Sequence, residues 1–434
     1  MKKSRIFAGM LSAVLAAGMM SASAFATEPP VDEPVAPGGN YTTPTVESDK
    51  SSTTITKYLI MDAEAYAPKV TMTYTLAPGT AAAAESADDY NVYAGIMTGV
   101  KYNSDTALTS ETAAETTISF TNESTKLNDD EASGLYGSFD EDTQMYVTDS
   151  FNIDFSGVAF PEPGIYRYTL TEADNRAEVT ALDNAERTLD VFIVDSSVDG
   201  GFVTANKKLA ISSIVVYSDV VTAKAKAAIT TAADTKSAAF NNEYTSHDLT
   251  LSKTVTGNQG SKDKYFKFTV AITGAGDSTK LDVVLANADG ALNTDASINS
   301  ALQGISNPAT LTTSSAGAVT QDFYLMHGQS IVINGLPDGA KYTITETVGE
   351  YTASAEVAGD ADAAADDEIA TNGIVSDTDT GIKADTTVAY TNNKEGTIPT
   401  GVILSIAAPV AIGVAIVAGI IILSVKKKRS ESEE

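Results

Sequence analysis

Apolar and polar residues alternate in short runs from Ser51 onward, and Gly, Pro, Asp or Asn residues separate the runs. Alternation with a period of two places one set of side chains on one face of a β-strand. No long amphipathic helical pattern occurs outside the two ends of the chain. We therefore predict an all-β protein whose strands pack as β-sandwiches.

Two segments of the chain repeat the same order of strand motifs. We predict two tandem domains, residues 51–245 and 246–396, joined around His247. The weakly patterned stretches Ala81 to Ser150 and Ala353 to Asp385 are expected to be insertions or long loops, where surface variation is tolerated.

The amino terminus has the pattern of a secretory signal. Three basic residues precede an apolar run that ends at Met20, and the small residues Ala24 and Ala26 follow. Residues 1–26 are therefore predicted to be a signal peptide. Residues 27–50 are predicted to be a linker, because five prolines and two glycines lie within positions 27–44.

The carboxyl terminus has the pattern of a membrane span. Residues 402–425 are mostly apolar, and as a helix they would extend about 36 Å, enough to cross a hydrocarbon core of about 30 Å. Residues 426–434 begin with four basic side chains, which predicts a cytoplasmic tail and an exported body. A simple type I membrane protein is one interpretation of this end.

Charge and cysteine content exclude several functions. Residues 27–400 carry 21 basic and 54 acidic side chains, a net charge of −33. Such a body repels phosphate backbones, so we predict no nucleic-acid partner. The chain has no Cys, which excludes disulfides, thiolate metal sites and Cys nucleophiles.

Polar side chains interrupt the apolar rows of the predicted strands at equivalent places in both segments. In each segment a Lys, a Glu and an Asn occur in this order on the predicted inner face: Lys57, Glu172 and Asn242, then Lys253, Glu346 and Asn392. A residue in a strand faces inward with a chance of about one in two. The probability that all six would face inward by chance is therefore about one in sixty.

Buried Lys, Glu and Asn side chains can react with one another. Desolvation lowers the pKa of an amine and raises that of a carboxyl, so both groups can be neutral together. The neutral amine can attack the Asn carbonyl while the acid polarises it, and ammonia then leaves an amide cross-link. We predict such an autocatalytic bond in each domain, assisted by Glu172 and Glu346.

The chain resembles the two-domain backbone pilins of streptococcal type. The motifs that carry the resemblance are TITKYLIMD, FPEPGIYRYTLTE, AAFNNEY, LTLSKTVTG, LPDGAKYTITE and VAYTNN, followed by TIPTG. The resemblance implies immunoglobulin-like domains, each with an internal Lys–Asn isopeptide bond. It also implies a sorting motif at 397–401, where a sortase would cut between Thr400 and Gly401. Pro399 directly precedes Thr400, which departs from the commonest form of such motifs.

The resemblance further implies that a sortase joins each subunit to a Lys of the next. Lys236 is the nearest candidate for that linkage, and Lys224 and Lys226 are alternatives. Implied partners are the sortase, other copies of the chain and cell-wall peptidoglycan, with the membrane involved only before sorting. The implied location is the surface of a Gram-positive bacterium.

No other constellation predicts a site. His247 and His327 are too few for a His-rich metal site and are each interpreted as capping a turn, and the acidic residues between Asp360 and Asp367 lack the spacing of an EF-hand. We predict no cofactor, no metal and no enzymatic turnover. The sequence thus favours a pilus backbone subunit. The alternative is a wall-anchored adhesin or binding stalk, and the sequence does not identify a host ligand.

Overall fold

The computed structural model describes residues 51–396 with short gaps. The gaps are residues 87–88, 104–106, 110, 174–175, 184, 196–197, 200–201, 204–208, 223–235, 288, 290, 292–307 and 360–372. Every regular secondary-structure element in the described part is a β-strand, which confirms the all-β prediction for these residues. The same part contains no helix long and apolar enough to cross a membrane. The predicted signal peptide, sorting motif, transmembrane helix and tail lie outside the described residues.

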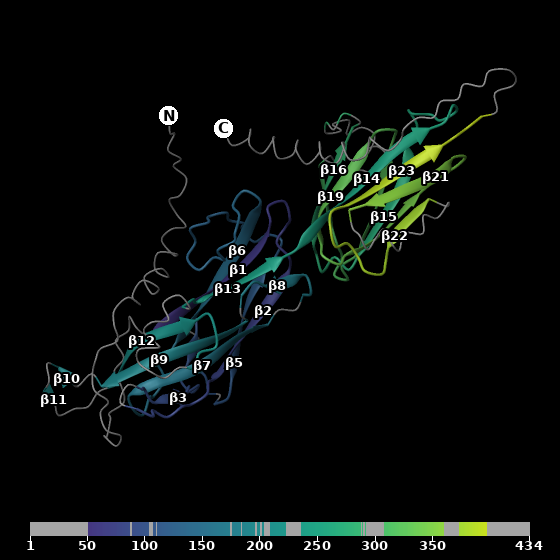
Figure 1. Ribbon diagram of the computed structural model, residues 1–434. Helices are drawn as coiled ribbons and strands as arrows, with labels where there is room; N and C mark the ends of the chain where they lie inside the picture. The colour runs from purple at the N-terminus through teal and green to yellow at the C-terminus, as the bar shows by residue number, and fades with distance from the viewer. Residues whose placement is uncertain are drawn as a thin grey trace, which may run out of the picture. The chain divides into compact units, whose positions relative to one another are not determined.

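The described chain divides into two compact units. The first unit contains the residues up to Ile60, Val70–Ser119 and Thr125–Glu243. The second unit contains Met61–Lys69, Phe120–Ser124 and the residues from Tyr244 onward. In Figure 1 the strands of the first unit run from purple to teal, and those of the second from teal through green to yellow.

The first unit has two main sheets. One has the strand order β4-β6-β1-β13-β8, and the other has the order β12-β9-β7-β2-β5 with β3 also paired to β7; β10 and β11 form a separate pair. The bounds are β1 Ser52–Asp62, β2 Val70–Pro78, β3 Val92–Ala94, β4 Lys101–Tyr102, β5 Ala114–Phe120, β6 Gln144–Asp154, β7 Gly164–Ala173, β8 Val179–Ala181, β9 Glu186–Asp195, β10 Val198–Asp199, β11 Phe202–Val203, β12 Leu209–Tyr217 and β13 Ala239–Tyr244.

The second unit also has two sheets. Their strand orders are β17-β16-β19-β14-β23-β21 and β18-β15-β20-β22. The bounds are β14 Ser246–Thr256, β15 Phe266–Thr273, β16 Lys280–Ala286, β17 Ala309–Thr312, β18 Val319–Leu325, β19 Ser330–Pro337, β20 Lys341–Glu346, β21 Thr352–Ala358, β22 Ile374–Asp377 and β23 Thr386–Asn393.

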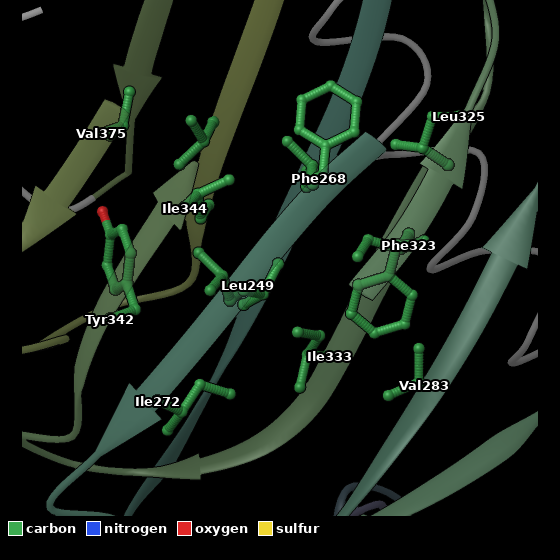
Figure 2. Packing of buried hydrophobic residues seen from close by; sticks show 14 of the residues in the cluster. Leu249, Phe268, Ile272, Val283, Phe323, Leu325, Ile333, Tyr342, Ile344 and Val375 are labelled. Atoms are coloured by element: carbon green, nitrogen blue, oxygen red, sulfur yellow. The ribbon is translucent and has the colours of Figure 1, made fainter. Parts of the chain in front are cut away.

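The core of the second unit lies between its two sheets. Strand β15 shows why, because its residues from Phe266 to Ile272 alternate between buried and half-buried positions, so that one face is entirely apolar. Figure 2 shows Leu249 and Ile333 of one sheet among Phe268 and Phe323 of the other. A sandwich of this kind can hold a polar side chain in its interior only if that side chain has a partner there.

The first and last long strands of each unit are neighbours. Strand β1 lies beside β13, and β14 lies beside β23. The β14–β23 pairing is parallel, with Leu249 opposite Thr386 and Thr256 opposite Asn393. Since the two ends of each unit run through adjacent strands, a bond between them would close almost the whole unit into a ring.

The expectation that two stretches would be insertions or long loops is wrong where these stretches form strands of the sheets. The stretch Ala81 to Ser150 supplies β3, β4, β5 and most of β6, and Ala353 to Asp385 supplies most of β21 together with β22. Strand β6 lies directly beside β1 and buries Tyr146 and Val147. Its buried positions do not alternate strictly, so a search for a period of two misses it.

Candidate functional site

Lys57 lies in the middle of β1 with its side chain buried. The neighbours two positions away, Ile55 and Leu59, are both 0% exposed. The Nζ atom of Lys57 donates a hydrogen bond to Oε1 of Glu172 over 2.9 Å, and the two side chains are 0% and 3% exposed. Because β1 and β7 belong to different sheets, this ion pair spans the interior of the first unit.

Asn242 lies on β13, beside β1, and is 1% exposed. Its Nδ2 atom is buried and has no hydrogen-bond partner among the described residues. The preceding Asn241 is also buried, but its Nδ2 donates to the oxygens of Gly134 and Asp183, and its Oδ1 accepts from the backbone N–H of Tyr136. Asn241 is therefore fully engaged in structural hydrogen bonds, whereas the amide nitrogen of Asn242 is not.

The second unit brings Lys253, Glu346 and Asn392 into direct contact. The Nζ atom of Lys253 donates to Oε1 of Glu346 over 2.6 Å, and Nδ2 of Asn392 donates to the same oxygen over 2.7 Å. The exposed fractions of the three residues are 1%, 3% and 0%. An amine, a carboxyl and a carboxamide thus meet in an interior that excludes water.

The strand register explains how Lys253 and Asn392 come together. In the parallel pairing of β14 with β23, Lys253 is opposite Tyr390 and Val255 is opposite Asn392. Lys253 and Asn392 therefore point to the same face of the sheet, offset by two residues. The following Asn393 points the other way, is exposed and accepts a hydrogen bond from the hydroxyl of Thr256.

Burial changes the charge state of the amine in the second unit. Desolvation lowers the pKa of Lys253 to about 8, against the opposing effect of the neighbouring Glu346 carboxylate. The rings of Phe266 and Phe268 also lie near this nitrogen, at 4.5 and 5.6 Å from Nζ to the ring centroids. The amine of Lys253 therefore loses its proton, and becomes nucleophilic, at a lower pH than an ordinary lysine amine does.

Tyr74 is a site residue that the sequence reasoning missed. Its hydroxyl donates to Oε2 of Glu172 over 2.7 Å, and the residue is 0% exposed. Tyr74 belongs to the alternating apolar row of β2, where an aromatic side chain is expected to be an ordinary residue of the hydrophobic core. The signal that identifies it is the pairing of β2 with β7, which sets Tyr74 directly opposite Glu172.

Lys236, the candidate for linkage between subunits, is half-buried just before β13. It forms an isolated bridge with Tyr217, the last residue of β12. The alternatives Lys224 and Lys226 lie outside the described residues, as do Pro399, Thr400 and Gly401 of the predicted sorting motif.

The two histidines serve hydrogen bonds of the second unit. Nδ1 of His327 accepts from the backbone N–H of Val255, and Nε2 of His247 lies 3.0 Å from Oδ1 of Asp338. In the described part of the chain, no three His, Cys, Asp or Glu side chains are grouped as metal ligands would be. The acidic stretch from Asp360 to Asp367 lies outside that part.

An acidic cluster in the second unit gives its stability a pH dependence. Burial, together with the carboxylates of Asp385, Glu64 and Asp62, raises the pKa of Asp248 to about 7. The backbone N–H of Gly335 donates to Oδ1 of Asp248 and partly offsets this effect. Asp248 is therefore more easily protonated in the folded chain than in the unfolded chain.

We expect Asp248→Asn to stabilise the second unit at neutral pH. The folded pKa lies above the unfolded value, so the parent protein loses stability as pH rises from about 4 to about 7, on the order of 2 kcal/mol after allowance for relaxation. The side-chain amide of the variant can still accept the hydrogen bond from the backbone N–H of Gly335, but it does not ionise. Thermal unfolding followed over this pH range should show a flatter curve for the variant, and an unchanged slope would contradict the assignment.

Comparison with known proteins relates the chain to pilus proteins. A model of a domain family of unknown function matches residues 247–394. A pilin of Streptococcus pyogenes is 26% identical over 292 residues, which cover 65% of this chain and 73% of the pilin. A pilus tip adhesin of Streptococcus pyogenes is 32% identical over 161 residues, but these cover 36% of this chain and 18% of the adhesin.

A solved structure supports the fold. The structure of a major pilin of Streptococcus pyogenes aligns with a TM-score of 0.50 at 20% identity, and the alignment covers 80% of this chain and 98% of the pilin. The predicted resemblance to streptococcal backbone pilins is confirmed by these comparisons. The chain therefore has the β-sandwich architecture of such pilins.

Proposed function

We propose that this protein is a structural subunit of a surface pilus, and that each of its two domains, residues 51–245 and 246–396, is locked by an internal Lys–Asn isopeptide bond. The observation that carries the proposal is the contact of Lys253, Glu346 and Asn392 in a dry interior. The similarity to a streptococcal pilin supports the same function.

The reaction in the second domain needs no outside reagent. The lone pair of the neutral Lys253 amine attacks Cγ of Asn392, and the proton of Glu346 supports the developing oxyanion. The carboxyl then passes the amine proton to the leaving nitrogen, so that one C–N bond forms, another breaks and ammonia departs. The fold supplies the proximity, which raises the effective concentration of the amine by many orders of magnitude.

Unpaired acceptors support a neutral amine and a protonated carboxyl as the reacting state. Among the described residues, Oδ1 of Asn392 and Oε2 of Glu346 are both buried without a hydrogen-bond partner. Buried acceptors without donors are costly. A proton on the Glu346 carboxyl would provide a donor to this group of atoms.

The position of the bond suits a protein under tension. Each bond would join the first long strand of a domain to the last, and these strands are neighbours in one sheet. Hydrogen bonds between strands can yield one after another under load, whereas an amide bond between the same strands does not. The domain would therefore transmit force through covalent bonds and resist unfolding kinetically.

Polymerisation by a sortase is the remaining part of the proposal. A sortase would cleave after Thr400 and join this residue to a lysine of the next subunit or to the cell wall. The acyl transfer keeps the number of amide bonds constant, so no energy source is required at this step. The adhesin alternative has support from the partial match to a pilus tip adhesin, which covers only 18% of that protein.

A gel of wall extracts tests polymerisation. Cells that make the protein should yield a ladder of multiples that survives boiling in detergent, and Thr400→Ala should abolish it. Lys236→Ala, Lys224→Ala and Lys226→Ala, made singly, identify the linking residue, because one of them should reduce the ladder to a single band. One wall-linked band from the parent protein would favour the adhesin and contradict the pilus subunit.

A further inference from the structure

The two cross-linking sites are built on equivalent strand pairs. Glu172 of β7 is opposite Tyr74 of β2, and Glu346 of β20 is opposite Phe268 of β15. The same position therefore carries a phenol in the first unit and a plain phenyl ring in the second. The two rings differ by one hydroxyl group, and that hydroxyl is directed at the carboxyl that the proposed reaction uses.

The hydroxyl changes the hydrogen bonding of the carboxyl. In the first unit, Oε1 of Glu172 accepts from Lys57 over 2.9 Å and Oε2 accepts from Tyr74 over 2.7 Å. In the second unit, Oε1 of Glu346 accepts from both Lys253 and Asn392, while Oε2 has no partner among the described residues. One carboxyl is thus held at both oxygens and the other at one.

Packing holds the Tyr74 ring in place. The ring contacts Phe151 and Phe240, with centroid distances of 4.9 and 5.4 Å. Phe240 lies two positions before Asn242 on β13, so the same aromatic group touches the strand that carries the reacting amide. Full burial and packing against two other rings restrict the direction of the hydroxyl.

We propose that Tyr74 is a positioning residue for isopeptide formation in the first unit, and that its absence from the second unit makes the two bonds form at different rates and with different pH dependence. This inference rests on the proposed function. Tyr74 would fix the rotamer of Glu172 and stabilise the negative charge that remains when the acid has delivered its proton. A hydrogen bond to a charged oxygen is stronger than one to a neutral oxygen, so it assists that step selectively.

Tyr74 acts in this scheme without losing its own proton. Burial and the adjacent Glu172 carboxylate raise the pKa of the Tyr74 hydroxyl far above its ordinary value. The phenol therefore stays a donor throughout the reaction, and Glu172 remains the group that moves protons. Tyr74 therefore does not change the overall reaction, in which an amide bond forms and ammonia leaves.

The test exchanges the two rings in the full mature chain. Newly made protein is quenched in denaturant before the bonds form and is then refolded by dilution into buffers of different pH. Mass spectrometry of the peptides that carry each Lys–Asn pair follows the loss of ammonia over time for each bond. The variants are Tyr74→Phe, Phe268→Tyr and the control Tyr168→Phe, which removes a buried hydroxyl from β7 that bonds to Ile96 instead of Glu172.

We expect Tyr74→Phe to slow the Lys57–Asn242 bond about tenfold, the factor that corresponds to one hydrogen bond to a charged group. Its pH–rate profile should move toward that of the Lys253–Asn392 bond, which forms in the same molecules and reports on their folding. Phe268→Tyr should move the second profile toward the first. Tyr168→Phe should leave both profiles unchanged.

Two results would overturn the inference in distinguishable ways. If the parent chain forms both bonds and the rate and pH profile of the first are the same in Tyr74→Phe, Tyr74 does not position Glu172 and the proposed function is untouched. If the parent chain never loses ammonia at Lys57 and Asn242, the cross-link itself is wrong in this unit, and the role of Tyr74 fails with it.

Discussion

Replacing Glu346 by alanine is expected to leave the Lys253–Asn392 bond unformed, so that the purified mature chain retains the mass of one ammonia molecule more than the parent. The carboxyl touches both reacting groups, at 2.6 and 2.7 Å, and is the only described acid in contact with them. Without it, no other described acid in contact with these groups could protonate the leaving nitrogen. Glu172→Ala should have the same effect on the first unit, and the double variant should retain two ammonia molecules.

The loss of the bond should also lower stability strongly. Lys253 and Asn392 are 139 positions apart, and the chain-entropy relation for cross-links gives about 5 kcal/mol for a loop of that length. For a unit of this size the corresponding decrease in Tm is roughly 10–20 °C. The variant also leaves the Lys253 amine buried without a partner, which adds to the loss.

Glu350→Ala provides the matched control for Glu346→Ala. Its carboxylate pairs with Lys394 on the surface and its side chain is 84% exposed, so neither the mass nor the Tm should change appreciably. Intact mass and thermal unfolding measure both predictions in one preparation. A parent chain that shows its full, uncross-linked mass would exclude the isopeptide bonds and leave the pilin resemblance standing.

Strand alternation predicts an inward position for each of the six side chains of the two proposed sites. A period of two assigns a face to every residue of a strand, and the Lys and Asn residues of β1, β13, β14 and β23 lie in the interior as the alternation predicts. Strand alternation also favours Asn242 over Asn241 as the reacting amide, although both residues are buried. The structure supplies a second reason for that choice, since the amide of Asn241 is already consumed by three hydrogen bonds.

Contacts between distant strands could not be predicted in the same way. Tyr74 meets Glu172 because β2 pairs with β7, and the two residues are 98 positions apart. Nothing local in either strand specifies that register, which depends on how the whole sheet is assembled. Strand β6 was missed because its buried positions do not alternate strictly, and its partner strand β1 is remote in the sequence.

Arg187 is a further residue that alternation alone does not explain. It lies on β9 and is 0% exposed, yet its guanidinium donates to the backbone oxygens of Ser218 and Ala239 over 2.8 and 3.0 Å. It also pairs with Asp183 and lies 4.5 Å from the centroid of the Phe240 ring. Ala239 and Phe240 belong to β13, so Arg187 ties the strand that carries Asn242 to the opposite sheet.

We expect Arg187→Met to destabilise the first unit by about 3–5 kcal/mol, because it removes the guanidinium donor from the carbonyl oxygens of Ser218 and Ala239 and breaks the ion pair with Asp183. Asp183→Asn should cost much less, since that side chain is 24% exposed and the guanidinium keeps its other partners. Arg187→Lys should not rescue the first effect, because one ammonium cannot reproduce the planar fork that reaches both carbonyls. Thermal unfolding of the full mature chain separates the three variants.

Arg187→Met also tests whether Arg187 is needed for the cross-link of the first unit to form. If Arg187 holds β13 in place before the bond forms, Arg187→Met should slow ammonia loss at Lys57 and Asn242 while the bond of the second unit forms normally in the same molecules. Equal rates at both sites in this variant would show that β13 docks without Arg187. Arg187 would then stabilise the folded unit without affecting the rate of bond formation. The position of β13 before the bond forms would depend on its pairing with β1 and β8.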